Sequence, residues 1–172
     1  MIEKSTIENV LVVFFENPSR EFHLRELSRV LKLSMPTIIS ATDKLSREKL
    51  ITKEKGKVLT KVMANRENIN FTRHKRLRNL ELIYESGLIE YTSNSYGHPK
   101  CIILFGSFSR GEDTEKSDID IAVITKKKLN LDFSQYEKVI KRSINLHEAD
   151  IEKVSREFKA NLANGIVMEG SW

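Results

Sequence analysis

The segment 106–123 constrains the fold of this chain more than any other. An apolar run, 101–105, leads into a turn of small residues, and a second β-prone run follows over 118–124. The second run opens with two aspartates, Asp118 and Asp120, separated by one apolar residue. Because residues two apart point to the same face of a strand, both carboxylates are expected to face one side of a sheet, with Ile119 packed on the other.

Two neighbouring carboxylates repel each other unless a cation lies between them. The turn that precedes them begins with Gly106 and Ser107. Glycine lets the backbone approach a ligand closely, and amides at the start of a helix carry partial positive charge that binds phosphate. A phosphate-binding turn beside a metal-binding acid pair is what phosphoryl or nucleotidyl transfer needs. A purely structural interpretation stays open, because such acid pairs also occur on solvated edge strands and most Gly-Ser pairs form ordinary turns.

The rest of this half predicts further elements around a third acid. We expect a helix over 131–146, a strand over 149–154, a helix over 155–163 and a last short strand over 166–168. If the strand 149–154 lies beside the strand of the acid pair, Asp150 joins the same cluster, with Glu152 as a competitor on the same face. Three carboxylates would hold two Mg²⁺ ions, one to activate an attacking hydroxyl and one to orient a triphosphate and stabilise the leaving pyrophosphate.

The N-terminal half predicts a different architecture. Ser5 and Glu8 have the spacing of a capping box that opens a first helix. A second helix is expected over 25–31 and a third over 34–48. Two β-prone runs around Gly56 then predict a hairpin. This order of helix, short strand, helix, tight turn, helix and hairpin is typical of a winged helix-turn-helix.

Charge is distributed unevenly along the chain. Residues 1–98 hold 17 lysines and arginines against 12 acidic residues, whereas residues 99–172 hold 12 of each, so the net charge of +5 lies in the N-terminal part. Such an excess favours an anionic partner, with nucleic acid the first candidate. A solvated basic surface would have the same composition, and that alternative stays open.

Residues 3–65 resemble winged-helix DNA-binding regulators. In that family the third helix enters the major groove and the tip of the wing contacts the DNA backbone. The residues expected to bind DNA are Thr37, Ser40, Lys44 and Arg47 on the third helix, and Lys55 and Lys57 on the wing. A winged helix used only for protein contacts or dimerisation is the alternative.

A second resemblance covers about residues 99–168. Gly-Ser-Phe-Ser-Arg-Gly at 106–111 and Ser-Asp-Ile-Asp-Ile-Ala-Val at 117–123 resemble the nucleotidyltransferase superfamily that includes DNA polymerase β, and most of all its minimal prokaryotic members. Those members carry Gly-Ser-x-Ala-Arg-Gly and then Ser-Asp-Ile-Asp-Leu-x-Val, so Ser109 in place of alanine is a small departure.

This resemblance implies a mixed sheet flanked by helices, with Mg²⁺ as cofactor and ATP or another nucleoside triphosphate as substrate. It implies metal-binding and catalytic roles for Asp118, Asp120 and, with less support, Asp150. It implies nucleotide binding by Gly106, Ser107 and Arg110. Related polymerases and tRNA-modifying enzymes carry large helical domains after the third acid, and this chain has none there, so template-directed synthesis is not expected.

Minimal nucleotidyltransferases are often antitoxins paired with a HEPN-domain ribonuclease, and they transfer AMP from ATP to a tyrosine of that toxin. The resemblance therefore implies transfer of a nucleoside monophosphate to a hydroxyl of a partner protein, coupled to DNA binding. Two other interpretations stay open. One is a DNA-binding transcriptional regulator whose nucleotidyltransferase fold only binds nucleotide or a partner, and the other is transfer to a small molecule.

The expected fold class is α+β, in three parts. A winged helix-turn-helix domain is expected over 1–66, connecting helices over 67–98 and a minimal nucleotidyltransferase domain over 99–172. No apolar run approaches the roughly 18 residues of a membrane span, and the N-terminus lacks the pattern of a signal peptide. The single cysteine, Cys101, cannot form an internal disulfide. We therefore expect a cytoplasmic protein, with DNA, a nucleoside triphosphate and a toxin as partners, and a homodimer is compatible with this view.

Overall fold

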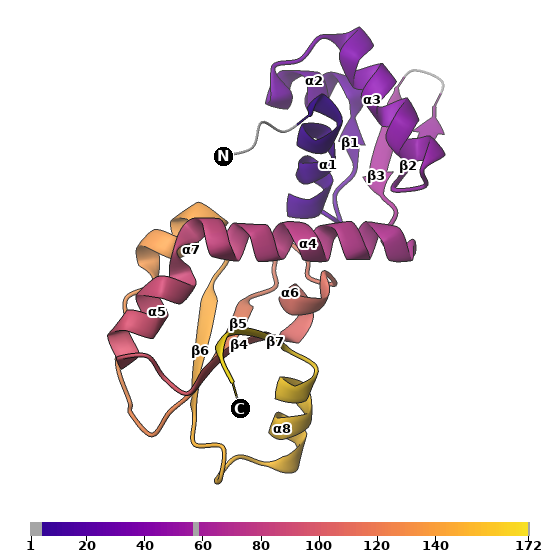
Figure 1. Ribbon diagram of the computed structural model, residues 1–172. Coiled ribbons are helices and arrows are strands. Elements are labelled where there is room, and N and C mark those ends of the chain that lie inside the picture. Colours follow the sequence, from indigo (N-terminus) through magenta and orange to yellow (C-terminus); the bar gives the residue numbers. More distant parts are fainter. Residues whose placement is uncertain (1–4, 57–58, 172) are drawn as a thin grey trace. The chain divides into compact units, whose positions relative to one another are not determined.

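Two compact units, residues 1–75 and 76–172, make up the chain in the computed structural model, which describes residues 5–56 and 59–171. The chain passes from one unit to the other within helix α4 (Ile69–Ser86) (Figure 1). No helix among the described residues is both long and apolar enough to cross a bilayer. Each unit has its own sheet and its own buried core, so each can be described by itself.

The first unit contains three helices, a short strand and a hairpin, and it ends within α4. Its elements are α1 (Thr6–Glu16), β1 (Phe22–His23), α2 (Leu24–Leu31), α3 (Met35–Arg47), β2 (Ile51–Lys55) and β3 (Thr60–Ala64). Strand β3 pairs antiparallel with both β1 and β2, which gives a three-stranded sheet in the order β1-β3-β2. The predicted order of elements in this half is confirmed.

Local signals account for the helix starts in the first unit. The Glu8 amide donates to Ser5 Oγ (3.3 Å), and the Ser5 amide donates to the Glu8 carboxylate (2.7 Å), which is the predicted capping box. Ser34 Oγ accepts from the Thr37 amide (3.3 Å) at the start of α3, where Pro36 occupies the first turn. These contacts satisfy amides that have no partner within their own helix.

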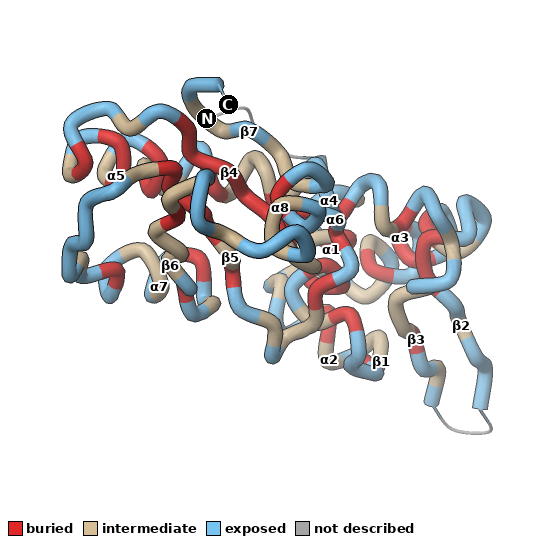
Figure 2. The backbone as a smooth tube through the Cα atoms, turned by 90° about the horizontal axis from the view of Figure 1, so that it is seen from below, coloured by how far each residue is buried: buried red, intermediate tan, exposed pale blue. Residues whose placement is uncertain are grey.

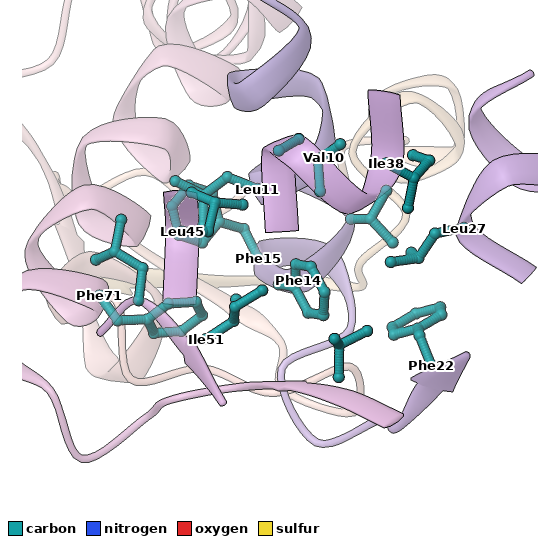
Figure 3. Close-up of a cluster of buried hydrophobic side chains, with 14 residues drawn as sticks. Val10, Leu11, Phe14, Phe15, Phe22, Leu27, Ile38, Leu45, Ile51 and Phe71 are labelled. Carbon is teal, nitrogen blue, oxygen red and sulfur yellow. The ribbon is translucent and has the colours of Figure 1, made fainter. Parts of the chain in front are cut away.

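Apolar side chains from the helices and the sheet form one core in the first unit (Figure 3). The inner face of α3 is buried as expected, and its members are Ile38, Ala41, Thr42 and Leu45. Phe14 and Phe22 meet edge to face, with ring centroids 5.6 Å apart. At the edge of this core, Lys53 of β2 pairs with Asp43 of α3 (2.7 Å) and lowers the pKa of that carboxyl. The hairpin is therefore held against α3.

The second unit is built around a four-stranded sheet. After α4 its elements are α5 (Leu88–Tyr96), β4 (Cys101–Phe105), α6 (Gly106–Arg110), β5 (Ile119–Ile124), α7 (Ser134–Ile140), β6 (Ile144–Ala149), α8 (Arg156–Ala163) and β7 (Ile166–Gly170). The strand order is β6-β5-β4-β7, in which β5 and β6 run parallel and the other pairs run antiparallel. The predicted mixed sheet with flanking helices is confirmed.

Both faces of this sheet are covered, and β4 is buried along its whole length (Figure 2). One face, which includes Leu104 and Ile121, packs against apolar side chains of α4, α5 and α7. The other face, which includes Ile103 and Ala122, packs against Leu162 of α8. Because side chains alternate along a strand, each residue of β5 and β6 can be assigned to the α8 face or to the opposite face.

The structure corrects one stretch of the predicted secondary structure. The helix expected over 131–146 ends at Ile140, where Lys141 adopts a left-handed backbone (φ 60°). The strand expected over 149–154 instead spans Ile144–Ala149, and residues 151–153 form a turn. The strand is thus displaced by five residues toward the N-terminus, which changes the side chains that lie beside the acid pair.

Candidate active site

Strand β5 positions both aspartates of the acid pair. Ile119 and Ile121 pack on the face covered by α5, so Asp120 and the preceding Asp118 belong to the α8 face. Asp118 is exposed, and the Asp120 side chain is 29% exposed. The two carboxylates lie at the N-terminal end of an inner strand, where the polar side chains can still reach solvent.

Gly106 brings the turn after β4 directly against Asp120. Phe105 and Asp120 are partners in the antiparallel register of β4 and β5, so the next residue after Phe105 faces the carboxylate. Gly106 has φ 75°, and a Cβ built on it would overlap Asp120 Oδ2. Only glycine therefore meets both demands at this position, the left-handed backbone and the absence of a side chain.

Hydrogen bonds hold the segment that follows this turn. Ser109 Oγ donates to the Gly106 carbonyl (2.8 Å) within α6. Asn79 of α4 donates from Nδ2 to the Phe108 carbonyl (2.9 Å) and to Asp113 Oδ1 (2.7 Å). Asn79 and Asp113 are both buried, so these contacts fix the backbone between the glycine turn and the acid strand.

A cleft of about 780 Å³ opens beside the turn and Asp120. Its walls are formed by Arg76, Phe105, Gly106, Arg110, Asp120, His147, Phe158, Asn161 and Asn164. The rings of Phe105, Phe158 and His147 form a cluster, with centroids 5.2 to 5.8 Å apart. The cleft thus combines two arginines, one member of the acid pair and an aromatic wall.

Asp118 borders a second cleft, of about 620 Å³. Basic side chains of this cleft are Lys116, Lys138, Lys141 and Arg142, and its acidic ones are Glu115, Asp118 and Glu137. The acid pair therefore lies between two clefts, with Asp120 in the wall of the first and Asp118 in the wall of the second.

The structure does not bring Asp150 to the acid pair. In the parallel register of β5 and β6, Asp120 lies opposite Asn145, and Ala149 lies opposite Ile124. Asp150 follows the end of β6, five residues beyond Asn145, which corresponds to roughly 16 Å along the strand. The Asp150 carboxylate instead accepts the Glu152 amide (3.3 Å) in the turn after β6.

The expectation that Asp150 or Glu152 completes a three-carboxylate cluster is therefore corrected. The cause is the position of β6, because a strand over 149–154 would have placed Asp150 where Asn145 lies. Among the described residues, no group of three histidine, cysteine or acidic side chains is arranged to hold a metal ion.

Two polar residues of β6, Asn145 and His147, lie on the α8 face beside the pair. Asn145 Nδ2 lies 3.2 Å from Asp118 Oδ2 and 3.5 Å from Asp120 Oδ1. His147 Nε2 lies 3.5 Å from Asp120 Oδ1, is buried, and has no hydrogen-bond partner among the described residues. Neither residue was predicted from the sequence as part of the site, although the alternation of Ile144, Asn145, Leu146 and His147 is the pattern of a half-buried strand.

The donor set fits one divalent cation. Two carboxylates converge on a single amide group, and Mg²⁺ prefers oxygen ligands of this kind. His147 Nε2, a buried nitrogen with no hydrogen-bond partner among the described residues, lies 3.5 Å from Asp120 Oδ1. The set does not supply the third carboxylate on which the expectation of two protein-bound Mg²⁺ ions rested.

The other nucleotide-binding candidates lie around the turn. Gly106 and Ser107 begin α6, as expected for a backbone that approaches a ligand. Arg110 lines the first cleft, and its Nε donates to Glu112 (2.7 Å) with the side chain 46% exposed. Arg76, which the sequence analysis did not single out, lines the same cleft.

The residues predicted to contact DNA belong to the first unit. Ser40, Lys44 and Arg47 are exposed along α3, whereas Thr37 is half-buried and its hydroxyl lies 2.7 Å from the Ser34 hydroxyl. Lys55 is exposed at the end of β2. Lys57 lies outside the described residues.

The fold and the site together define a class of protein domain. An acid pair on an inner strand of a mixed sheet faces a glycine turn and borders a cleft. Residues 87–171 match the protein-family model described as polymerase beta, nucleotidyltransferase. This match supports a nucleotidyltransferase domain in the second unit and, with it, the general chemistry of nucleoside monophosphate transfer. No curated protein and no solved structure gives a significant match to the chain.

Proposed function

We propose that the second unit transfers a nucleoside monophosphate, AMP from ATP, to a hydroxyl of a partner protein. The observation that carries this proposal is the position of Asp120 against Gly106 and of the acid pair between two clefts, in a region that matches a nucleotidyltransferase family. A transferase needs two substrates to meet at one reactive point, and this arrangement offers a cleft for each.

In this proposal the first cleft receives the nucleotide. The side-chain-free turn at Gly106 and Ser107 lets polyphosphate approach the backbone amides, and Arg76 and Arg110 lie in the same cleft to offset its negative charge. A base can pack on the wall formed by Phe105, His147 and Phe158.

A divalent cation held by Asp118 and Asp120 would neutralise charge at the phosphate under attack. The chain's own contribution is to hold those carboxylates in place, through the register of β4 and β5 and the close contact with Gly106. The acceptor hydroxyl would approach from the second cleft, at Asp118. The reaction forms a bond from this oxygen to the α-phosphorus, breaks the bond between the α-phosphorus and the departing pyrophosphate, and releases the hydroxyl proton to solvent.

The first unit supports a DNA-binding function. Its three helices and hairpin match the element order of a winged helix-turn-helix, and three polar or basic residues of α3, Ser40, Lys44 and Arg47, are exposed. Together with the transferase, this favours an antitoxin that modifies a HEPN-domain ribonuclease and represses the operon of the pair.

The test uses the full chain, [α-³²P]ATP, Mg²⁺ and the protein encoded beside it. Label should pass to a hydroxyl of that protein, and Asp118→Asn and Asp120→Asn should each lower turnover by at least about 10²-fold, the scale for loss of one preorganised electrostatic group. Asp150→Asn is the matched control, because it makes the same chemical change outside the site, and it should retain turnover within about twofold. Full transfer by both pair variants would reject this site.

A second function is favoured by one specific observation. An amide, Asn145, lies where a third carboxylate was expected, so the site carries less negative charge than the predicted cluster. This supports a DNA-binding regulator whose nucleotidyltransferase fold only binds nucleotide or a partner. Operator binding that changes with ATP, in a protein that transfers no label to any candidate acceptor, would favour the regulator over the transferase.

A further inference from the structure

Asn145 occupies the point on which the two carboxylates of the site converge. Its Nδ2 reaches Asp118 Oδ2 at 3.2 Å and Asp120 Oδ1 at 3.5 Å. The parallel register places it directly opposite Asp120, on the same face of the sheet. The position of the Asn145 backbone is therefore set by the pairing of β6 with β5 and does not depend on a flexible loop.

We infer that Asn145 is the third protein ligand of the cation site and that it binds the ion through Oδ1. In the cation-free arrangement, the amide N–H₂ group donates to the carboxylates and offsets their repulsion. A cation at this point would repel the N–H₂ group and attract the amide oxygen. A half-turn of the terminal amide exchanges the two groups without moving the backbone, because they are nearly equal in size.

The neutral amide also determines how many ions the protein can hold alone. Asp118 and Asp120 supply two negative charges, which balance one divalent cation. A second cation would leave an excess of two positive charges, so it would enter only with the phosphates of a bound nucleotide. The inference rests on the proposed function only in that the cation serves nucleotide binding, and it predicts one ion per chain when nucleotide is absent.

The experiment titrates the full chain with Mn²⁺ in the absence of nucleotide and measures free Mn²⁺ by electron paramagnetic resonance. Wild type should bind one ion. Asn145→Ala should bind it at least about tenfold more weakly, the range seen when groups around a metal are removed. Asn145→Asp should bind at least about tenfold more tightly, because it adds a full charge at the point of convergence.

Asn161→Asp is the matched control. Asn161 lines the same cleft from α8, so this variant adds an equal charge near the site but not between the aspartates. It should change the dissociation constant less than about threefold, in line with a solvent-screened charge. Thermal melting of each variant establishes that it is folded.

Three outcomes would overturn the inference. They are Mn²⁺ binding by Asn145→Ala within twofold of wild type, equal tightening by Asn145→Asp and Asn161→Asp, and no binding by wild type or Asn145→Asp. Failure of the proposed function gives a different pattern, in which the Mn²⁺ affinities follow the expected order and no label is transferred from ATP.

Discussion

At the scale of single residues, Gly106 is the position where a backbone requirement and a contact with the candidate site coincide. It needs a left-handed conformation, and it has no room for a Cβ beside Asp120. Gly87 has nearly the same conformation, with φ 73° against 75° at Gly106, but apart from its own local backbone no described atom lies within 4 Å of the place where its Cβ would be. Alanine variants of these two glycines therefore separate the cost of backbone strain from the cost of displacing a carboxylate.

We expect Gly87→Ala to lower the free energy of unfolding by about 1–2 kcal/mol, the cost of a left-handed alanine. Gly106→Ala should lower it by at least as much, because its methyl group also overlaps the Asp120 carboxylate. Only Gly106→Ala should also weaken ATP binding, by at least about tenfold, because its methyl group displaces the Asp120 carboxylate and narrows the turn. Isothermal titration with ATP and Mg²⁺ measures this difference. Equal ATP affinity in the two variants would show that the contact between turn and carboxylate does not matter for binding.

Away from the acid pair, Tyr96 and Glu148 form a hydrogen bond that affects the pKa of both side chains. Burial of Tyr96 and its hydrogen bond to Glu148 raise the pKa of the phenol. Burial alone would raise the pKa of Glu148, but hydrogen bonds from Tyr96, the Leu129 amide and Lys128 outweigh it and lower that pKa below its ordinary value of 4.5. Since the folded-state pKa is lowered, this carboxylate stabilises the fold above about pH 4.5, and the contribution is lost as the pH falls through the folded value.

Tyr96→Phe should therefore lower the free energy of unfolding by about 2 kcal/mol at pH 7, the scale for a hydrogen bond to a charged group. The loss should shrink as the pH falls below 4.5, because protonation removes the charge that the phenol stabilises. Hydrogen exchange of the β6 amides, measured from pH 7 to below pH 4.5, gives the loss of unfolding free energy in this variant. Tyr84→Phe, on an exposed side chain, is the control and should cost less than about 0.5 kcal/mol at every pH. A pH-independent loss at Tyr96 would contradict the assigned pairing.

At the scale of secondary-structure elements, most of the chain could be predicted, and β6 could not. Capping signals and apolar stripes predicted α1 and α3, a continuous apolar run predicted β4, and alternation of acidic and apolar residues predicted the start of β5. Helix α7 ends at Ile140, and the next residue, Lys141, adopts a left-handed backbone. No glycine or proline follows the helix, so the sequence carries no signal that it ends there. The apolar stripe of this segment therefore predicts a helix that continues to residue 146.

That single misplaced boundary accounts for the missed half of the candidate site. The acid pair and the glycine turn lie within one short segment, and their shared face follows from a period of two. Asn145 and His147 come from a different strand, and their place beside the pair depends on the parallel register of β5 and β6. A shift of one residue in this register would move every side chain of β6 to the other face of the sheet. The register between two strands that are distant in sequence cannot be predicted from either strand alone.

Helix α3 is the element that we expect to bind DNA. Lys44 and Arg47 are exposed one turn apart, so both can reach one groove. Lys44→Ala and Arg47→Ala should each weaken binding to the upstream region of the protein's own operon. A residue that contacts phosphate should also reduce the salt slope by about one. Fluorescence anisotropy at several salt concentrations measures both effects.

The control for α3 is Arg156→Ala, which removes the same charge from an exposed position on α8 in the other unit. It should leave the salt slope unchanged. If the three variants lose affinity equally, net charge and not the surface of α3 governs binding. If wild type binds no operator DNA at about 50 mM salt, where phosphate contacts are strongest, the DNA-binding proposal fails.

At the scale of the whole molecule, the described residues form one hydrophobic core in the first unit and two in the second, one on each face of its sheet, and the sheets of the two units share no strand. Each ligand should therefore stabilise the unit that binds it. A ligand present at 100 times its dissociation constant stabilises the folded state by about 2.7 kcal/mol. This gain should appear in the amides whose exchange requires opening of that unit, and not in those of the other.

Hydrogen exchange of the full chain tests this separation. ATP with Mg²⁺ should slow exchange in β4, β5 and β6, and operator DNA should slow exchange in α1 and α3. At 100 times the dissociation constant each change should approach about 100-fold, because each 1.4 kcal/mol corresponds to a factor of ten. Asp120→Asn should abolish the first effect and keep the second, whereas Arg47→Ala should do the reverse. Slowing of α3 amides by ATP would instead reveal coupling between the units. Thermodynamic linkage then requires operator DNA to change ATP affinity by the same factor, which is the behaviour expected of the regulator and not of two independent modules.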